Sequence, residues 1–314
     1  VKQALSISPA SYLIRNVYLN SLQPRWGGSI KMMQLFATAS QKYANDNPRI
    51  HFLIGEVYSE VASIERMAKN YTKADELYAK SLTFGESHQL FFDQAYSSYL
   101  QENYDQALVN INKAIQLYAE SGNYYYWRSR ILTKQLAYLD AVKNLQYAEQ
   151  LNPYSTKFKK RKAWLSNKLV RKAYDFGQNA DVSKQIEYCT LALQLEPNHA
   201  KAYSRRARGY VRQNKLQLAL EDAKEAIRLQ PKNVTSYDLI DYILAFGEDW
   251  KSIIKYWSQY IALNPNDGHA YVERGGAYYR SGNLQAAVTD AKTSADLGNP
   301  MGKRLYKKFK NKVK

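Results

Sequence analysis

Three prolines recur at an interval of 34 residues, and this spacing constrains the fold more than any other feature of the chain. Pro197, Pro231 and Pro265 each follow a segment rich in alanine and leucine. Repetition at a fixed period of roughly 20 to 50 residues is typical of chains built from one repeated structural unit. Each such unit buries its apolar face against its neighbours, so an array of units is expected rather than one central core.

The clearest unit covers residues 200–233, AKAYSRRARGYVRQNKLQLALEDAKEAIRLQPKN. Tyr203, Ala207 and Tyr210 recur at i, i+4 and i+7, a spacing that places all three on one face of a helix. The chain has only 14 glycines and 8 prolines, as expected for packed helices. The same spacing predicts a second helix in this unit, on Ala219, Ala223, Ala226 and Leu229.

These residues resemble the tetratricopeptide repeat (TPR), which has small residues where two helices approach closely and a proline near the end of each unit. The same register fits, with varying quality, six more units: 55–87, 88–121, 122–155, 166–199, 234–267 and 268–301. The resemblance implies an all-α fold, a right-handed superhelical solenoid of about seven antiparallel helix pairs. An N-terminal helical pair and a C-terminal capping helix are expected at its ends.

Two units and one insertion depart from the pattern. In 234–267 the positions that need small side chains hold Asp241, Ile253 and Tyr260, so its two helices are expected to splay or shift. In 268–301 the proline comes one residue late. The extra segment 154–166 is expected to lengthen one helix or to separate two groups of repeats.

Five parts of the chain follow from this register. They are an N-terminal helical module (1–54), a first TPR-like sub-array (55–155), a helical insertion (156–165), a second sub-array (166–299) and a basic capping helix (300–314). The capping helix is expected to pack one stripe against the last repeat: Met301, Leu305, Phe309 and Val313.

The stretch QPRWGG joins two predicted helices of the N-terminal module, whose expected N-caps are Ser8 and Ser29. We expect Pro24 to stop the first helix, Trp26 to anchor the corner, and Gly27–Gly28 to permit positive φ. The stretch is similar to the PRWGG motif of a bacterial family of unknown function that is found beside TPR-like helices.

A phosphate-binding role for this corner is disfavoured, because a phosphate loop needs a preceding strand and a Lys-Ser/Thr after its glycines. We interpret the stretch as a structural corner. Arg25 and Trp26 form a secondary candidate surface for a partner.

The net charge of +17 is unevenly distributed. Residues 122–233 contain 22 Lys and Arg against 9 Asp and Glu, and residues 300–314 contain 7 against none. Such asymmetry indicates an acidic partner rather than a particular fold.

No motif for catalysis is present: there is no HExxH, no GxSxG and no paired-carboxylate signal. The single cysteine, Cys189, lies on the apolar side of a predicted helix, and the four histidines have no metal-ligand spacing. We expect no enzyme activity, no metal and no cofactor.

The TPR resemblance implies that the first helix of each repeat lines a concave groove. Here the groove is expected to have an aromatic N-terminal half and a cationic centre, suited to an acidic and apolar segment of a partner protein. The alternative is that these charges are solvated, as expected also for Arg206 and Arg228. The candidate partner-binding residues are Phe92, Tyr96, Tyr99, Tyr126, Trp127, Arg130, Lys134, Arg171, Tyr174, Lys201, Arg205, Arg208 and Arg212.

The function predicted from these features is that of a protein–protein interaction scaffold or assembly factor. The composition and the PRWGG resemblance suggest a bacterial protein, and Val1 in place of Met suggests export to the periplasm, where such scaffolds help to assemble envelope or secretion machines. A cytoplasmic location stays open, as does the oligomeric state. The alternative function is nucleic-acid binding through the basic middle block and tail, and a further possibility is contact of the tail with anionic lipid.

Overall fold

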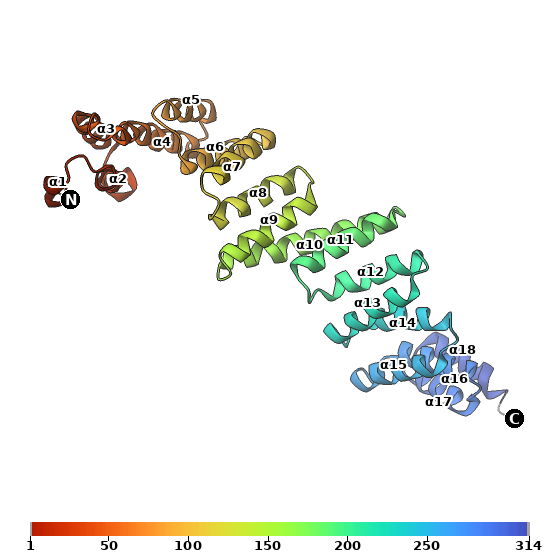
Figure 1. Ribbon diagram of the computed structural model, residues 1–314. Coiled ribbons are helices and arrows are strands. Elements are labelled where there is room, and N and C mark those ends of the chain that lie inside the picture. The colour runs from red at the N-terminus through yellow and green to blue at the C-terminus, as the bar shows by residue number, and fades with distance from the viewer. Residues whose placement is uncertain (1, 313–314) are drawn as a thin grey trace. The chain divides into compact units, whose positions relative to one another are not determined.

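The computed structural model describes residues 2–312, and every regular element that it contains in that range is helical (Figure 1). The chain divides into two compact units, Val1–Phe158 (unit 1) and Lys159–Lys314 (unit 2). The all-α fold and the seven helix pairs predicted from the repeat are therefore confirmed. The division into units falls inside one helix, α10, and the five-part organisation given above stays a prediction.

Unit 1 begins with three α-helices and three short 3₁₀ helices that precede the repeats. These are α1 (Lys2–Ile7), α2 (Tyr12–Ser21), η1 (Pro24–Trp26), α3 (Ile30–Ser40), η2 (Gln41–Tyr43) and η3 (Pro48–His51). Three antiparallel pairs follow: α4 (Phe52–Met67) with α5 (Tyr71–Leu82), α6 (His88–Leu100) with α7 (Tyr104–Leu117), and α8 (Gly122–Lys134) with α9 (Tyr138–Leu151).

Four further pairs and one final helix follow, and α10 starts in unit 1 and continues into unit 2. The pairs are α10 (Thr156–Gln178) with α11 (Val182–Leu195), α12 (Ala200–Arg212) with α13 (Leu216–Leu229), α14 (Val234–Ala245) with α15 (Trp250–Leu263), and α16 (Gly268–Arg280) with α17 (Leu284–Asp296). The final helix is α18 (Pro300–Lys310).

Each helix pair is closed by the same tight turn, which contains one residue in the left-handed region. In the turn between α12 and α13, Asn214 has a φ of 55°, and the N–H of Lys215 donates to the carbonyl of Tyr210 at 2.9 Å. This six-to-one bond is the Schellman motif, which satisfies carbonyls at the end of the first helix. The equivalent left-handed residues of the other pairs are Lys69, Glu102, Leu136, Ala180, Glu248 and Gly282.

The small positions of the repeat are buried, as the periodicity predicts. Ala207, Ala219 and Ala223 are fully buried where α12 meets α13. In the irregular unit 234–267, the large side chains Ile253 and Tyr260 are buried in their place, and α14 and α15 are in less extensive contact than α12 with α13 or α16 with α17. The expected splay or shift of this pair stays a prediction.

The N-terminal module corrects two local expectations and confirms a third. The N-cap of α2 is Ser11 rather than Ser8, because Pro9 lies in a turn whose carbonyl accepts from Arg15 Nε at 2.8 Å. Trp26 does not anchor the corner, since 71% of its surface is exposed. Ser29 caps α3 as predicted.

The two glycines of the corner have different roles. Gly27 adopts a φ of 89°, which a residue with a Cβ rarely takes. Gly28 has no positive φ, and a Cβ there would lie 2.1 Å from the carbonyl oxygen of Leu22. The first glycine therefore permits the turn, and the second permits close approach of two backbone segments.

The final helix, α18, packs on the last repeat with a stripe that differs from the predicted one. Phe309 is buried and stacks on Tyr279 at a centroid distance of 4.5 Å, as a capping role requires. Met301 is exposed, because Gly302 is the residue that meets α17, where a Cβ would collide with Ser294. Val313 lies outside the described residues.

Candidate functional site

Five of the predicted groove side chains form one aromatic cluster in unit 1. Trp127 of α8 lies at the centre, with its ring centroid 4.7 Å from that of Tyr96 and 5.5 Å from that of Tyr99, both on α6. Phe92 and Tyr126 complete the cluster at 6.1 and 6.0 Å. We call these residues the Trp127 cluster. Edge-to-face ring pairs of this kind hold their geometry without hydrogen bonds.

The two predicted cations of α8 lie against aromatic rings. The guanidinium carbon of Arg130 is 4.1 Å from the centroid of Trp127, and its Nη2 donates to the hydroxyl of Tyr99 at 3.4 Å. Lys134 is exposed, and hydrogen bonding to the hydroxyl of Tyr104 raises its pKa. The cluster therefore holds a cation against aromatic rings that are partly exposed, except that of Tyr126, which is buried and does not line a surface as predicted.

In unit 2 the predicted cations follow one face of α12. Their spacing of four, three and four residues brings them onto a single stripe of the helix. The stripe consists of Lys201, Arg205, Arg208 and Arg212.

Two arginines of this stripe bind the preceding helix α10 rather than solvent. Arg205 Nη1 donates to the carbonyl of Val170, and Arg212 Nη1 donates to the carbonyl of Gly177, both at 2.6 Å. Burial lowers the pKa of Arg205, whose guanidinium also lies 4.9 Å from the ring centroid of Tyr174. These two arginines fasten α12 to α10, so their first role is structural.

The remaining cations of the region are exposed. Arg171, Lys201 and Arg208 make no hydrogen bond or ion pair with any residue between 2 and 312. Tyr174, whose ring is in cation–π contact with the guanidinium of Arg205, has 48% of its surface exposed. We call these four residues the Arg208 face: three open cations beside one accessible aromatic ring.

Arg206 was expected to face water, and this expectation is wrong. Its Nε and Nη2 each donate at 2.8 Å to the two carboxylate oxygens of Asp222, and its Nη1 donates to the hydroxyl of Thr190 at 3.2 Å. The side chains of Arg206 and Asp222 are only 18% and 8% exposed. This fork-to-fork pair joins three helices, α11, α12 and α13. Arg228, the other arginine expected in water, is exposed and pairs with Glu225.

The same clamp recurs in the last repeat. Arg274 binds both carboxylate oxygens of Asp290 at 2.8 Å, and its Nη1 donates to Ser258 at 3.1 Å. Arg274 follows Arg206 by 68 residues, two repeat lengths.

Unit 1 contains a version of the clamp in which the arginine binds uncharged acceptors. Arg128 Nε donates to Asn144 Oδ1 at 2.7 Å, and its Nη1 donates to Asn112 Oδ1 at 2.9 Å. All three arginines occupy position 7 of their repeats, and the acceptor in the same repeat is always 16 residues later. This period in Arg and Asp was the sequence signal that would have identified the clamp.

The secondary candidate surface contains one engaged and one open side chain. Arg25 donates to the Gln23 side-chain oxygen through Nε at 2.8 Å and faces a cavity of unit 1. Trp26 projects away from the protein body, as its exposure indicates.

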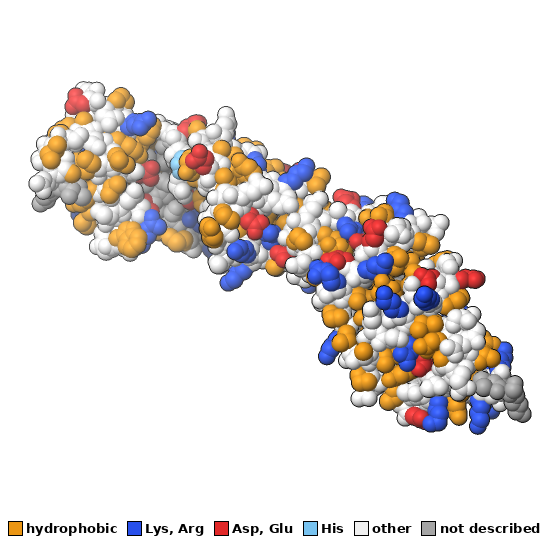
Figure 2. Space-filling model, turned by 60° about the horizontal axis from the view of Figure 1, so that its bottom comes forward, with side chains coloured by type: hydrophobic (Ala, Val, Ile, Leu, Met, Phe, Trp, Pro, Cys, Tyr) orange, Lys and Arg blue, Asp and Glu red, His pale blue; other side chains and the backbone are white. Residues whose placement is uncertain are grey.

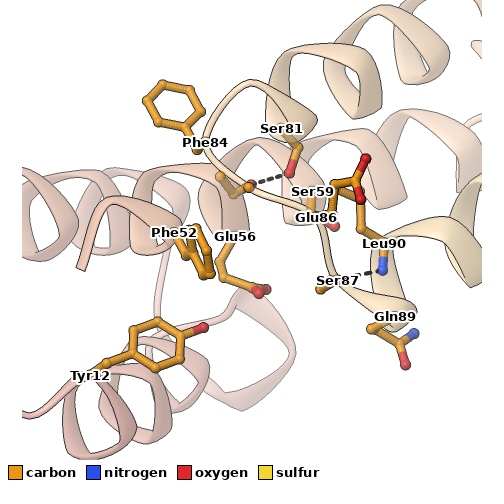
Figure 3. Close-up of a pocket in the computed structure, with 12 residues that line it drawn as sticks. Tyr12, Phe52, Glu56, Ser59, Ser81, Phe84, Glu86, Ser87, Gln89 and Leu90 are labelled. Carbon is orange, nitrogen blue, oxygen red and sulfur yellow. Dashed lines mark hydrogen bonds between the residues drawn. The ribbon is translucent and has the colours of Figure 1, made fainter. Parts of the chain in front are cut away.

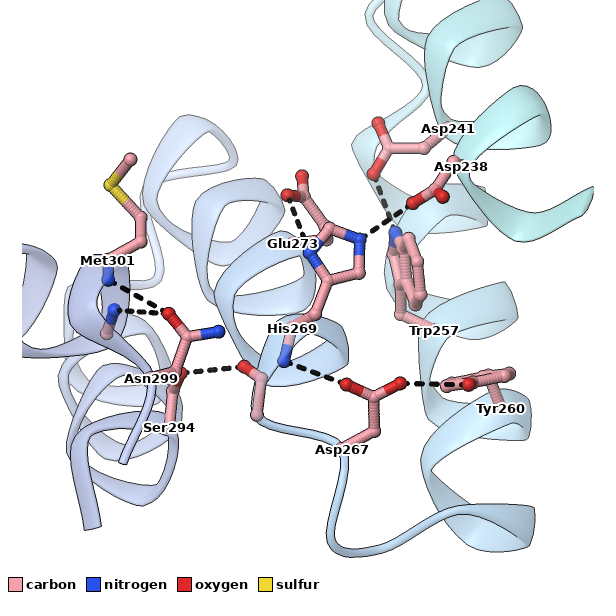
Figure 4. Close-up of polar contacts among 12 residues, drawn as sticks. Asp238, Asp241, Trp257, Tyr260, Asp267, His269, Glu273, Ser294, Asn299 and Met301 are labelled. Carbon is pink, nitrogen blue, oxygen red and sulfur yellow. Dashed lines mark hydrogen bonds and ion pairs between the residues drawn. The ribbon is translucent and has the colours of Figure 1, made fainter. Parts of the chain in front are cut away.

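Cys189 and His269 belong to residue types that often act in catalysis, but here both lie in structural environments. Cys189 is buried, and burial raises the pKa of its thiol to about 12. His269 lies between Asp238, at 2.8 Å from Nε2, and Glu273, at 3.7 Å from Nδ1, and the bond to Asp238 raises its pKa (Figure 4).

Among residues 2–312 no three His, Cys, Asp or Glu side chains are grouped so as to hold a metal ion. In the same range no helix is both long and apolar enough to cross a bilayer.

The comparisons with known proteins match parts of the chain to TPR proteins. No family model matches. Protein PHOX3 of Arabidopsis thaliana is 41% identical over 61 residues, which is 19% of this chain and 8% of that protein. Tetratricopeptide repeat protein 36 of Caenorhabditis briggsae is 40% identical over 73 residues, 23% of this chain and 41% of that one. The chain thus spans less than half the length of these curated relatives.

Solved structures of TPR proteins are similar at low identity. Yeast Tom70 is 14% identical with a TM-score of 0.42, over 92% of this chain and 61% of that one. YrrB, described as a TPR protein with an unusual peptide-binding site, is 19% identical with a TM-score of 0.36, over 62% of this chain and 94% of that one. The 34-residue helix pairs and the local sequence matches show that the described chain has a TPR-like fold.

Proposed function

We propose that this chain is a non-enzymatic interaction scaffold that binds an acidic and apolar segment of a partner protein. The observation that carries the proposal is the contrast between two sets of arginines in unit 2. Arg206 and Arg274 are neutralised by buried aspartates, whereas Arg208 and its neighbours have no acidic partner within the described residues. Cations left open beside an exposed tyrosine are suited to carboxylates supplied from outside.

Each unit offers its own candidate surface for such a segment. The Arg208 face of unit 2 provides open donors for carboxylates, with Tyr174 as apolar contact area. The Trp127 cluster of unit 1 provides aromatic edges, with Arg130 fixed over its central ring. Tyrosine and tryptophan bury a large area at low entropic cost, as peptide-binding surfaces require.

The test uses the two open arginines and leaves Arg205 intact, since Arg205 fastens α12 to α10. In an anisotropy titration with a labelled peptide of alternating Glu and Leu, Arg171→Glu/Arg208→Glu is expected to weaken binding at least tenfold. The control Lys224→Glu/Lys232→Glu changes the net charge by the same amount at exposed positions elsewhere in unit 2. It is expected to change the affinity for the peptide less than twofold. Equal effects of the two double variants would overturn the proposal.

Nucleic-acid binding is the competing outcome of the same titration. A single-stranded oligonucleotide bound through phosphates loses affinity by decades between low and physiological salt. Tighter binding of the oligonucleotide than of the peptide, with such a salt slope, would replace the scaffold proposal.

The proposal includes a cellular setting: a partner in a bacterial envelope or secretion machine, met in the periplasm. Fractionation of cells that express the full-length protein tests this part separately. Recovery in the cytoplasmic fraction alone would remove the envelope setting and leave the peptide-binding proposal standing.

A further inference from the structure

A polar cavity of about 700 Å³ opens in unit 1 between the N-terminal module and the first two repeats. Its walls come from α2, η1, α4 and the start of α6. Figure 3 shows a smaller adjoining pocket, in which Tyr12 and Glu56 extend toward the same space. In Figure 2 acidic, basic and histidine side chains surround a hollow near this end of unit 1.

Three carboxylates from two helices face the cavity: Glu56 and Glu60, one turn apart on α4, and Asp93 on α6. None of them forms an ion pair with another residue between 2 and 312. Glu60 accepts a hydrogen bond from Gln23 Nε2, and Asp93 accepts one from Gln89 Nε2, each at 3.1 Å. Both donors are neutral amides, and Arg66 and Arg25 act on the charge of Asp93 only at longer range.

The two arginines of the cavity wall are engaged with other groups. Arg25 donates to Gln23 at 2.8 Å. Arg66 Nε donates to the hydroxyl of Tyr78 at 3.2 Å, and its guanidinium lies 4.7 Å from the ring centroid of Tyr96. Neither arginine comes within ion-pair distance of a cavity carboxylate.

This environment disfavours the charged form of two of the carboxyl groups, those of Glu56 and Asp93. Burial raises the pKa of Asp93 to about 6 and also raises the pKa of Glu56. A carboxylate withdrawn from water gains most from a cation that replaces its lost hydration. An external ammonium or guanidinium group would supply that cation.

We propose that this cavity binds a lysine or arginine side chain carried by an extended basic segment of a partner protein. Its volume exceeds what one ammonium group needs and admits several residues of extended chain. The amide side chains of Asn16, Asn20 and Gln89 on the wall supply donors and acceptors for a peptide backbone. The site takes the charge opposite to that bound by the Arg208 face, so it adds a second ligand class and does not depend on the proposed function.

The test is an anisotropy titration of the full chain with a labelled, terminally blocked octapeptide of two lysines and two arginines separated by serine and glycine. Glu60→Gln/Asp93→Asn preserves side-chain shape and removes two charges from the cavity. It is expected to weaken binding at least tenfold. The matched control Glu76→Gln/Glu120→Gln removes two charges from exposed positions of unit 1 and is expected to change affinity less than twofold.

Three results would overturn the inference. The first is equal affinity of the cavity and control variants, with both folded by circular dichroism. The second is binding of free spermidine as tight as that of the octapeptide, which would make the ligand a small cation. The third is concentration-dependent self-association in sedimentation velocity that Glu60→Gln/Asp93→Asn abolishes, which would make the ligand a second copy of this chain, whose residues 300–314 contain seven Lys and Arg.

Discussion

Units 1 and 2 are built from the same helix pair, but two carboxylates of each unit have opposite kinds of partner. In unit 2, Asp222 and Asp290 are each held by both arms of an arginine fork. In unit 1, Glu60 and Asp93 face a cavity and are met only by neutral amides. The backbone arrangement does not explain this difference in partners, because both sets of carboxylates lie on helices of the repeats.

The contrast separates structural charges from charges available for binding. A bidentate pair at fixed repeat positions uses up the charge inside the protein. A charge without such a partner, whether the cavity carboxylates of unit 1 or Arg208 of unit 2, remains available for an external ligand. The following predictions, ordered by expected effect, test whether this separation holds.

Asp222→Ala is expected to have the largest effect. It leaves the guanidinium of Arg206 partly buried with no carboxylate, which costs about 3 kcal/mol of the free energy of unfolding of unit 2. Urea denaturation followed by far-UV circular dichroism measures the loss. The neighbouring exposed Glu221→Ala is the control, with an expected change below about 0.5 kcal/mol. Equal effects at the two positions would mean that the clamp is not structural.

Asp93→Asn is expected to stabilise the free protein by about 2 kcal/mol at pH 7. Burial raises the pKa of Asp93 from 3.8 to about 6, so the folded state binds the proton more tightly than the unfolded state. Stability conferred by this group is therefore lost as pH rises from about 4 to about 6 and stays level above that. Asparagine carries no charge and removes this decline.

Urea titrations at several pH values between 4 and 7 check the Asp93 prediction. The groups around Asp93 that also carry charge are Glu56, Glu60, Arg25 and Arg66. A residual slope from Glu56, whose pKa is also raised by burial, is expected. A stability that rises with pH over this range in the wild type, and is unchanged by Asp93→Asn, would show that the cavity does not penalise the carboxylate.

Asn144→Asp is expected to move unit 1 toward the arrangement of unit 2. It gives Arg128 a charged acceptor where it now has an amide oxygen at 2.7 Å. Hydrogen bonds to a charged acceptor are stronger than those to a neutral one. Part of this gain is offset, because the hydrogen bond that the Asn144 amide donates to the backbone carbonyl of Asp140 is lost. The net stabilisation expected is about 0.7 kcal/mol, measured as a shift of the urea midpoint. The reverse change, Asp222→Asn, is expected to lower the midpoint for unit 2.

Much of the fold was predictable because the helix pair is encoded by local spacing. The alanines of 200–233 and the prolines at its boundaries identify two helices, and the structure contains both. The N-terminal module was less predictable, since Ser8 and Ser11 are equally good N-caps in sequence. The choice between them depends on Arg15, which reaches from α2 to the carbonyl of Pro9.

The candidate site was predictable only in part, for a physical reason. Position within the repeat indicates which helix face a side chain occupies, and it brings Tyr96, Tyr99 and Trp127 together as expected. It does not indicate whether another residue of the chain already satisfies that side chain. Arg205 and Arg208 lie on the same stripe. Of these two, Arg205 donates to a carbonyl of α10 and Arg208 does not.

Trp26→Ala is expected to have the smallest effect on stability, below about 0.5 kcal/mol, because little apolar area leaves water when an exposed side chain folds. Trp26 is 71% exposed, whereas Trp257 is 1% exposed and donates its indole N–H to Asp241 at 2.6 Å. A thermal unfolding scan of Trp26→Ala beside the wild type measures the difference. A loss above about 2 kcal/mol would restore Trp26 as the anchor of its corner; no loss would leave this tryptophan, like Arg208, as a side chain that the fold does not use and an external partner can.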